Sequence, residues 1–153
     1  MLSVGDQAPS FELPGNGDQT IKFPNGGAAI VYFYPKDDTP GCTTEAIEFS
    51  AAKDELNKLG VSIIGLSPDT AAKHDKFSKK HDLSISLAAD EEKTALEAYG
   101  VWVEKSMYGK TYMGVERSTF LVDATGKIVE IWRKVRVKGH VDKVLEIVRQ
   151  HFG

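Results

Sequence analysis

Cysteine is almost missing from this sequence, since its 153 residues contain only one, Cys42. A single cysteine excludes a disulfide framework, a Cys-x-x-Cys redox pair and a zinc site built from several thiolates. A chain of this length also needs no such cross-links, because it can bury roughly two thirds of its unfolded surface in one core. We therefore expect a single domain over residues 1–153 with no structural metal.

Long apolar runs and an excess of positive charge are missing as well. No stretch of about 18 apolar residues occurs, and the first residues show no basic segment followed by an apolar one. The formal net charge of −3 argues against a broad basic surface for nucleic acid or membrane lipid. We therefore expect no membrane or nucleic-acid partner, and a cytoplasmic protein whose thiol stays reduced.

Signals for a cofactor or an anionic ligand are sparse. The basic residues of 133–143 alternate with valines, which indicates the solvated face of a half-buried strand, with a site for an anionic partner as the alternative. No phosphate-binding glycine loop or dinucleotide fingerprint occurs, so no nucleotide cofactor is expected. The histidines lack metal-ligand spacing, so we expect no metal ion. Surface positions are expected for His74, His81, His140 and His151.

What the sequence does contain is an alternation of strand-like and helix-like segments. Residues 28–34 and 61–67 are continuous apolar runs, typical of strands covered on both faces. Their order with the helical segments predicts an α/β fold with a central mixed sheet flanked by helices. Helices are expected over 42–59, 70–81, 91–99 and 140–151, an N-terminal hairpin over 10–13 and 20–23, a strand over 85–88, an irregular segment over 101–116, and a hairpin around the turn 124–127.

Cys42 lies between the strand over 28–34 and the helix that follows, where open α/β sheets place their chemistry. We expect the Thr39 side chain to cap this helix at the Cys42 amide, and Pro40 to occupy the first helical position. Cys42 then falls in the first turn, where the helix dipole favours a thiolate. From residue types alone, an inert buried thiol and a reactive thiol both remain open.

The stretch YFYPKDDTPGCTTEA, residues 32–46, resembles the active-site signature of the peroxiredoxins, and specifically of their bacterioferritin-comigratory or Q-type branch. Pro35, Thr39 and Cys42 meet the family pattern of proline, three residues, threonine, two residues and cysteine. The similarity extends to GDQAPSFELP near the start, to GLSPD in the middle, and to the segment over 99–128 and the closing helix. It implies a thioredoxin-like fold and a thiol-dependent peroxidase.

The resemblance also implies roles for individual residues. Cys42 is then the peroxidatic cysteine, which attacks a hydroperoxide and becomes a sulfenic acid. Thr39 positions the peroxide, Pro35 and Pro40 shape and shield the pocket, and Arg117 completes the site. From the residues alone, Arg117 can equally be a surface arginine at a sheet edge. A redox-sensing module of the same fold without efficient turnover is the alternative function.

Ile47 stands where many Q-type members carry a second, resolving cysteine. The chain therefore resembles a one-Cys variant, in which an external thiol such as thioredoxin, glutaredoxin or glutathione must reduce the sulfenic acid. We expect the Ile47 side chain to pack on the core, and the protein to be a monomer or a weak homodimer.

The remaining residues near these motifs allow weaker expectations. Asp37 and Asp38 are expected to point to solvent, because a carboxylate facing the thiol would disfavour its ionisation. Four large apolar side chains either line a collar for alkyl peroxides or pack in the core and loops. They are Trp102, Met107, Tyr108 and Tyr112.

Overall fold

The computed structural model describes all 153 residues and contains a central sheet of five strands. They are β3 (Ala28–Phe33), β4 (Val61–Ser67), β5 (Ser86–Ala89), β8 (Ser118–Val122) and β9 (Ile128–Trp132). Their order across the sheet is β5-β4-β3-β8-β9. Because β3 pairs in parallel with β4 and antiparallel with β8, the predicted mixed sheet is confirmed.

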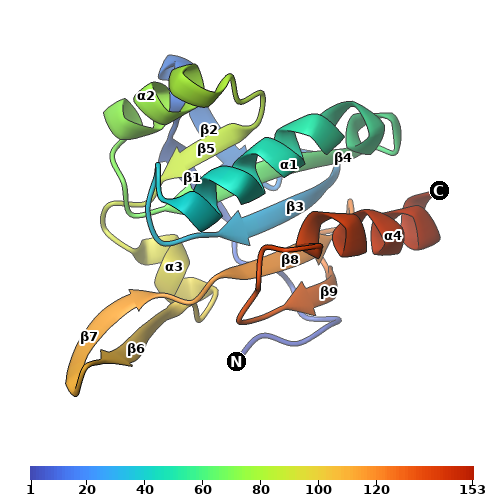
Figure 1. Ribbon diagram of the computed structural model, residues 1–153. Coiled ribbons are helices and arrows are strands. Elements are labelled where there is room, and N and C mark those ends of the chain that lie inside the picture. The colour runs from blue at the N-terminus through green and yellow to red at the C-terminus, as the bar shows by residue number, and fades with distance from the viewer.

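Helices cover both faces of this sheet. Helix α1 (Pro40–Lys58) lies across β3 with α4 (His140–Phe152) beside it, and α2 (Ala71–His81) lies near β5 (Figure 1). The short helix α3 (Thr94–Ala98) packs into the core on the opposite face. No helix is both long enough and apolar enough to cross a membrane.

Burial of both faces of the central strand β3 explains why its sequence is a continuous apolar run. All six of its residues are buried, because the two faces of the strand enter two different cores. Ile30 and Tyr32 pack beneath α1 and α4, whereas Val31 and Phe33 pack against the residues around α3. A strand covered on both faces has no position for an alternating polar residue.

Two hairpins flank the sheet. The predicted N-terminal hairpin is confirmed as β1 (Phe11–Pro14) paired antiparallel with β2 (Thr20–Phe23). The segment over 101–116, expected to be irregular, is instead a second hairpin of β6 (Trp102–Met107) and β7 (Lys110–Val115), which projects from the body of the molecule (Figure 1). Its turn residues Tyr108 and Gly109 have φ of 52° and 76°, the conformation of a tight two-residue hairpin turn.

Two other expectations need correction. Strand β9 ends at Trp132, so the basic stretch after it forms no strand. Lys134 has φ of 49° there, and the extended backbone is broken at that residue. The helix predicted over 91–99 is shortened to α3, because Lys93 also adopts the left-handed conformation.

Candidate active site

Cys42 is the third residue of α1 and only 1% exposed. The loop that leaves β3 places Pro40 at the first helical position, as the sequence predicts. The expected cap by Thr39 is wrong, because its hydroxyl donates to the Lys36 carbonyl at 2.8 Å and makes no hydrogen bond with the helix amides. The Thr39 backbone is nevertheless extended, as an N-cap residue requires, and its carbonyl accepts from the Thr43 amide at 2.8 Å.

Arg117 reaches the cysteine sulfur across 75 positions of sequence. Its Nη2 donates to Cys42 Sγ at 3.2 Å, and its Nη1 donates to Glu45 Oε1 at 2.7 Å. The antiparallel pairing of Phe33 with Ser118 explains the approach, because it brings the residue before β8 to the end of β3. Burial by itself lowers the pKa of Arg117, but the charges of Glu45 and Cys42 outweigh this effect and raise it.

A cavity of about 440 Å³ opens beside the Arg117 guanidinium. Pro35 and Arg117 form one part of its wall, residues 103–105 of the β6–β7 hairpin form another, and Lys134 and Val135 complete it. The Val135 amide donates to the Arg117 carbonyl at 2.9 Å, which ties this wall to the site. The structure therefore brings Pro35 and Arg117 to the same cavity, and Arg117 links this cavity to the buried sulfur.

Glu45 is a site residue that the sequence analysis missed. It is fully buried one turn after Cys42, and its Oε2 has no hydrogen-bond partner. Burial raises the pKa of Glu45 to about 7, although the Arg117 charge and hydrogen bond act to lower it. The spacing of three residues from Cys42 would have placed Glu45 on the same helix face.

His140 is buried behind Glu45, contrary to the surface position expected for it. Its Nε2 lies 2.8 Å from Thr119 Oγ1 and 3.9 Å from Glu45 Oε2. Burial, with the positive charges of Arg117 and Lys143, lowers the pKa of His140 to about 4. The imidazole is therefore neutral at neutral pH.

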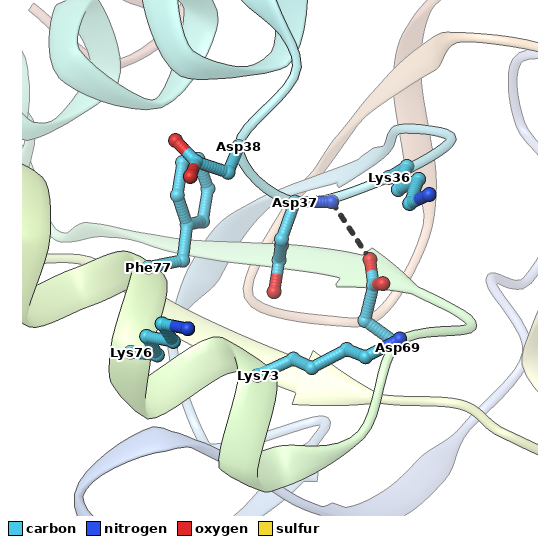
Figure 2. A pocket seen from close by; sticks show the side chains of 7 residues that line it. All are labelled: Lys36, Asp37, Asp38, Asp69, Lys73, Lys76 and Phe77. Atoms are coloured by element: carbon cyan, nitrogen blue, oxygen red, sulfur yellow. Dashed lines mark hydrogen bonds between the residues drawn. The ribbon is translucent and has the colours of Figure 1, made fainter.

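Asp37 is buried, although the sequence analysis expected it to face solvent. Its backbone amide donates to Asp69 Oδ2 at 2.8 Å (Figure 2). Its carboxylate accepts from the Tyr34 hydroxyl at 2.6 Å and lies 2.6 Å from Nδ1 of His74. The other ring nitrogen of His74 lies 3.0 Å from the Ala88 carbonyl. His74 is fully buried with both ring nitrogens facing these partners, so it is not the surface histidine that was expected.

Asp38 has the expected exposure and ties the same loop to α2 from outside. Its carboxylate accepts from Lys80 Nζ at 2.6 Å and lies 2.8 Å from His81 Nε2. These contacts lower the pKa of Asp38, with the His81 hydrogen bond as the largest cause. The loop before Cys42 is thus attached to α2 at two places, by the buried contact of Asp37 and by the exposed contacts of Asp38.

Ile47 does not pack on the core, because its side chain is 44% exposed. The buried face of α1 contains Cys42, Ala46 and Phe49, and residue 47 lies to one side of it. Of the four large apolar residues expected to line a collar or to pack in the core and loops, one packs against the core and three are exposed, and none lines the cavity beside Arg117. Trp102 is half-buried against the core around α3, whereas Met107, Tyr108 and Tyr112 are exposed.

The chain is similar to known proteins over nearly its whole length. The AhpC/TSA family model matches residues 4–131. Peroxiredoxin Bcp of Bacillus subtilis is 45% identical over 150 residues, which cover 97% of this chain and 96% of that protein. Peroxiredoxin Bcp of Escherichia coli is 41% identical over 152 residues, covering 98% and 97%.

A solved structure gives the same result. The bacterioferritin comigratory protein of Xanthomonas campestris, described there with its alkyl peroxide reduction activity, matches with a TM-score of 0.88 and 41% sequence identity, over 94% of this chain and 92% of that one. The thioredoxin-like peroxiredoxin fold expected from the resemblance is confirmed. This chain belongs to the AhpC/TSA family, and it is a thiol peroxidase of the peroxiredoxin type.

Proposed function

We propose that Cys42 carries the peroxidase reaction, with Arg117, Thr39 and Pro35 completing the catalytic site. The observation that carries this proposal is the 3.2 Å contact between Arg117 Nη2 and Cys42 Sγ in the first turn of α1. A guanidinium at this distance stabilises an anionic sulfur, and the positive end of the helix dipole acts in the same direction. The thiolate is the nucleophilic form of cysteine.

The reaction follows from these positions. The Cys42 thiolate attacks the terminal oxygen of the hydroperoxide, the O–O bond breaks, and the sulfur becomes a sulfenic acid. The other oxygen leaves with the bonding electrons and takes up a proton, so that water or an alcohol is released. Arg117 also faces the negative charge that develops on this leaving oxygen, which is where a fixed donor accelerates the reaction most.

Thr39 acts as an acceptor in this proposal. Its hydroxyl proton is already committed to the Lys36 carbonyl, so only the lone pairs of its oxygen remain for another partner. The O–H group on the terminal oxygen of a hydroperoxide can donate to the Thr39 oxygen, which would fix the orientation of the terminal peroxide oxygen. Pro35 offers no backbone N–H and forms part of the wall beside Arg117.

The substrate class is hydrogen peroxide and organic hydroperoxides. The cavity of about 440 Å³ that Arg117 lines offers room for an organic substituent. The similarity to a Xanthomonas campestris protein described with alkyl peroxide reduction activity supports the same choice.

An external thiol completes the cycle, because the chain has no second cysteine. Thioredoxin, glutaredoxin or glutathione is the proposed reductant, acting through a mixed disulfide with Cys42. The first turn of α1 must open for this step, since Cys42 is only 1% exposed. A reactive lone thiol of this kind suits the reducing cytoplasm. A monomer or weak homodimer remains our proposal for the oligomeric state.

Peroxide consumption with each candidate reductant in parallel tests the proposal. We expect turnover with at least one of the three thiols for hydrogen peroxide and for an alkyl hydroperoxide, and no turnover by Cys42→Ser. One equivalent of peroxide consumed without turnover by any thiol would instead support the redox-sensing alternative. Turnover by Cys42→Ser would contradict the assignment of Cys42.

A further inference from the structure

A single cation, the Arg117 guanidinium, hydrogen-bonds to two acidic groups in this site. Arg117 donates one N–H to Cys42 Sγ and another to Glu45 Oε1. Cys42 is 1% exposed and Glu45 is 0% exposed, so neither group can rely on water to stabilise a negative charge. A second buried anion beside a single guanidinium lacks a full compensating charge, which is energetically unfavourable.

The surroundings of Glu45 provide no second cation. Of the charges that act on this carboxyl, Arg117 alone favours ionisation, whereas Glu48 on the same helix opposes it. From α4, the neutral imidazole of His140 lies 3.9 Å from Oε2 and is already engaged with Thr119. Cys42 and Glu45 therefore compete for the same positive charge.

The Tyr32 hydroxyl, from β3, is a further uncharged group beside the Glu45 carboxyl. Its hydroxyl is buried without a hydrogen-bond partner, and burial followed by the charges of Glu45 and Cys42 raises its pKa well above the usual value. An ionised buried carboxylate normally has both oxygens hydrogen-bonded, but Glu45 Oε2 has no partner. A proton on Oε2 removes the unpaired charge and leaves Oε1 free to accept from Arg117.

We propose that Glu45 is a proton-linked positioning residue, which holds a proton while Cys42 is a thiolate and releases it when Cys42 becomes an uncharged sulfenic acid. This inference rests on the proposed peroxidase chemistry at Cys42. Arg117 then faces about one negative charge before and after the reaction, and it keeps its position between the two groups. The ordinary pKa of a glutamate is too low for such a change near neutral pH, whereas the burial of Glu45 raises its pKa to about 7.

The proton balance of the oxidation step follows directly. The thiolate and the hydroperoxide give a sulfenic acid and an alkoxide, or hydroxide, which must take up one proton. If Glu45 releases a proton in the same step, the protein and substrate together take up none from solution. When the external thiol later reduces the sulfenic acid, Cys42 returns to a thiolate and Glu45 regains its proton.

Counting protons during a single oxidation tests the inference. Reduced protein is mixed with stoichiometric hydrogen peroxide in weakly buffered solution with a pH indicator, and sulfenic acid is counted by trapping and mass spectrometry. Glu45→Gln is the matched variant, because its amide oxygen can still accept from Arg117 but it has no proton to release. Near pH 6 we expect clearly less than one proton taken up per Cys42 by the wild type and about one by Glu45→Gln.

The wild type provides a second test that needs no variant. Above about pH 8 Glu45 is ionised before the reaction, so proton uptake by the wild type should rise to about one per Cys42. Infrared difference spectra should also show loss of a protonated carboxyl band on oxidation near pH 6, and this loss should be absent from Glu45→Gln. Equal proton counts in both proteins at both pH values would overturn the inference.

The same experiment separates this inference from the proposed function. Rapid oxidation of Cys42 with equal proton counts contradicts the role of Glu45 and leaves the peroxidase proposal intact. Oxidation no faster than that of free cysteine contradicts the proposed function, whatever the proton count.

Discussion

Replacing Glu45 and replacing His140 should change the pH dependence of stability in opposite directions. Burial raises the pKa of Glu45 from 4.5 to about 7 against the opposing effect of Arg117. Between these values the folded protein holds a proton that the unfolded chain has lost. The Glu45 contribution to stability is therefore lost as pH rises from about 4.5 to 7, by about 3 kcal/mol at about 1.4 kcal/mol per pKa unit.

His140 acts with the opposite sign. Burial and the charges of Arg117 and Lys143 lower its pKa from 6.5 to about 4. Between these values the unfolded chain holds the extra proton, so this contribution to stability increases as pH rises, again by about 3 kcal/mol. In the wild type the two contributions overlap and largely cancel.

Urea unfolding from pH 4 to pH 8 measures both effects as differences from the wild type. Relative to the wild type, the free energy of unfolding of Glu45→Gln should increase by about 3 kcal/mol between about pH 4.5 and 7. That of His140→Asn should decrease by a similar amount between about pH 4 and 6.5. Exposed Glu91→Gln is the control and should give a flat difference. Difference curves of the same sign for the two buried variants would refute the assigned protonation states.

The remaining predictions concern the loop before Cys42 and the fate of its sulfur. Asp37→Ala should lower the free energy of unfolding by about 3–5 kcal/mol, because it leaves the buried His74 without its partner. Asp38→Ala on the exposed side should have a much smaller effect, because surface ion pairs are screened by solvent. Equal losses in urea titrations would contradict the assigned burial. Excess peroxide without a thiol should convert Cys42 to sulfinic and sulfonic acid, and mass spectra that show only sulfenic acid would count against this. Ile47→Cys should form a disulfide with Cys42 on oxidation and so reduce this overoxidation. Helix α1 must first unwind, because five helical residues span about 7.5 Å, too far for a disulfide. A free thiol at position 47 after oxidation would show that the helix stays closed.

The regular parts of the fold were predictable because their patterns are local. The run from Ala28 to Tyr34 has no polar alternation, which identifies a strand buried on both faces. The β6–β7 hairpin was not predicted, because exposed strands of mixed polarity carry a weak pattern and the turn at Tyr108 and Gly109 was not recognised. The alternation after Trp132 was misleading, since a left-handed residue at Lys134 ends the extended backbone.

The site was predictable only in part. Cys42 and Arg117 follow from a sequence motif, but their contact depends on the register of β8 against β3. Glu45 could have been found from its helical spacing to Cys42. His140 could not, because its place behind Glu45 depends on how α4 packs against α1, which no local pattern encodes.

Asp37 and Thr39 show a further limit of reasoning from residue types. Asp37 was expected to face solvent, but a buried histidine and a tyrosine hydroxyl, 37 and 3 residues away, supply its partners. Thr39 has the sequence position of a helix cap, yet its hydroxyl bonds the loop carbonyl of Lys36. Where a polar side chain has several possible partners, the loop conformation decides among them.

The rate constant for oxidation of Cys42 by hydrogen peroxide, measured by stopped flow in the wild type and in Arg117→Ala, tests the central claim most directly. Arg117→Lys, which retains the charge without the forked geometry, is the matched control. We expect the wild type to react far faster than free cysteine, and Arg117→Ala to lose about 10²–10³-fold with Arg117→Lys between them. A wild-type constant equal to that of free cysteine, or an unchanged constant in Arg117→Ala, would contradict the account.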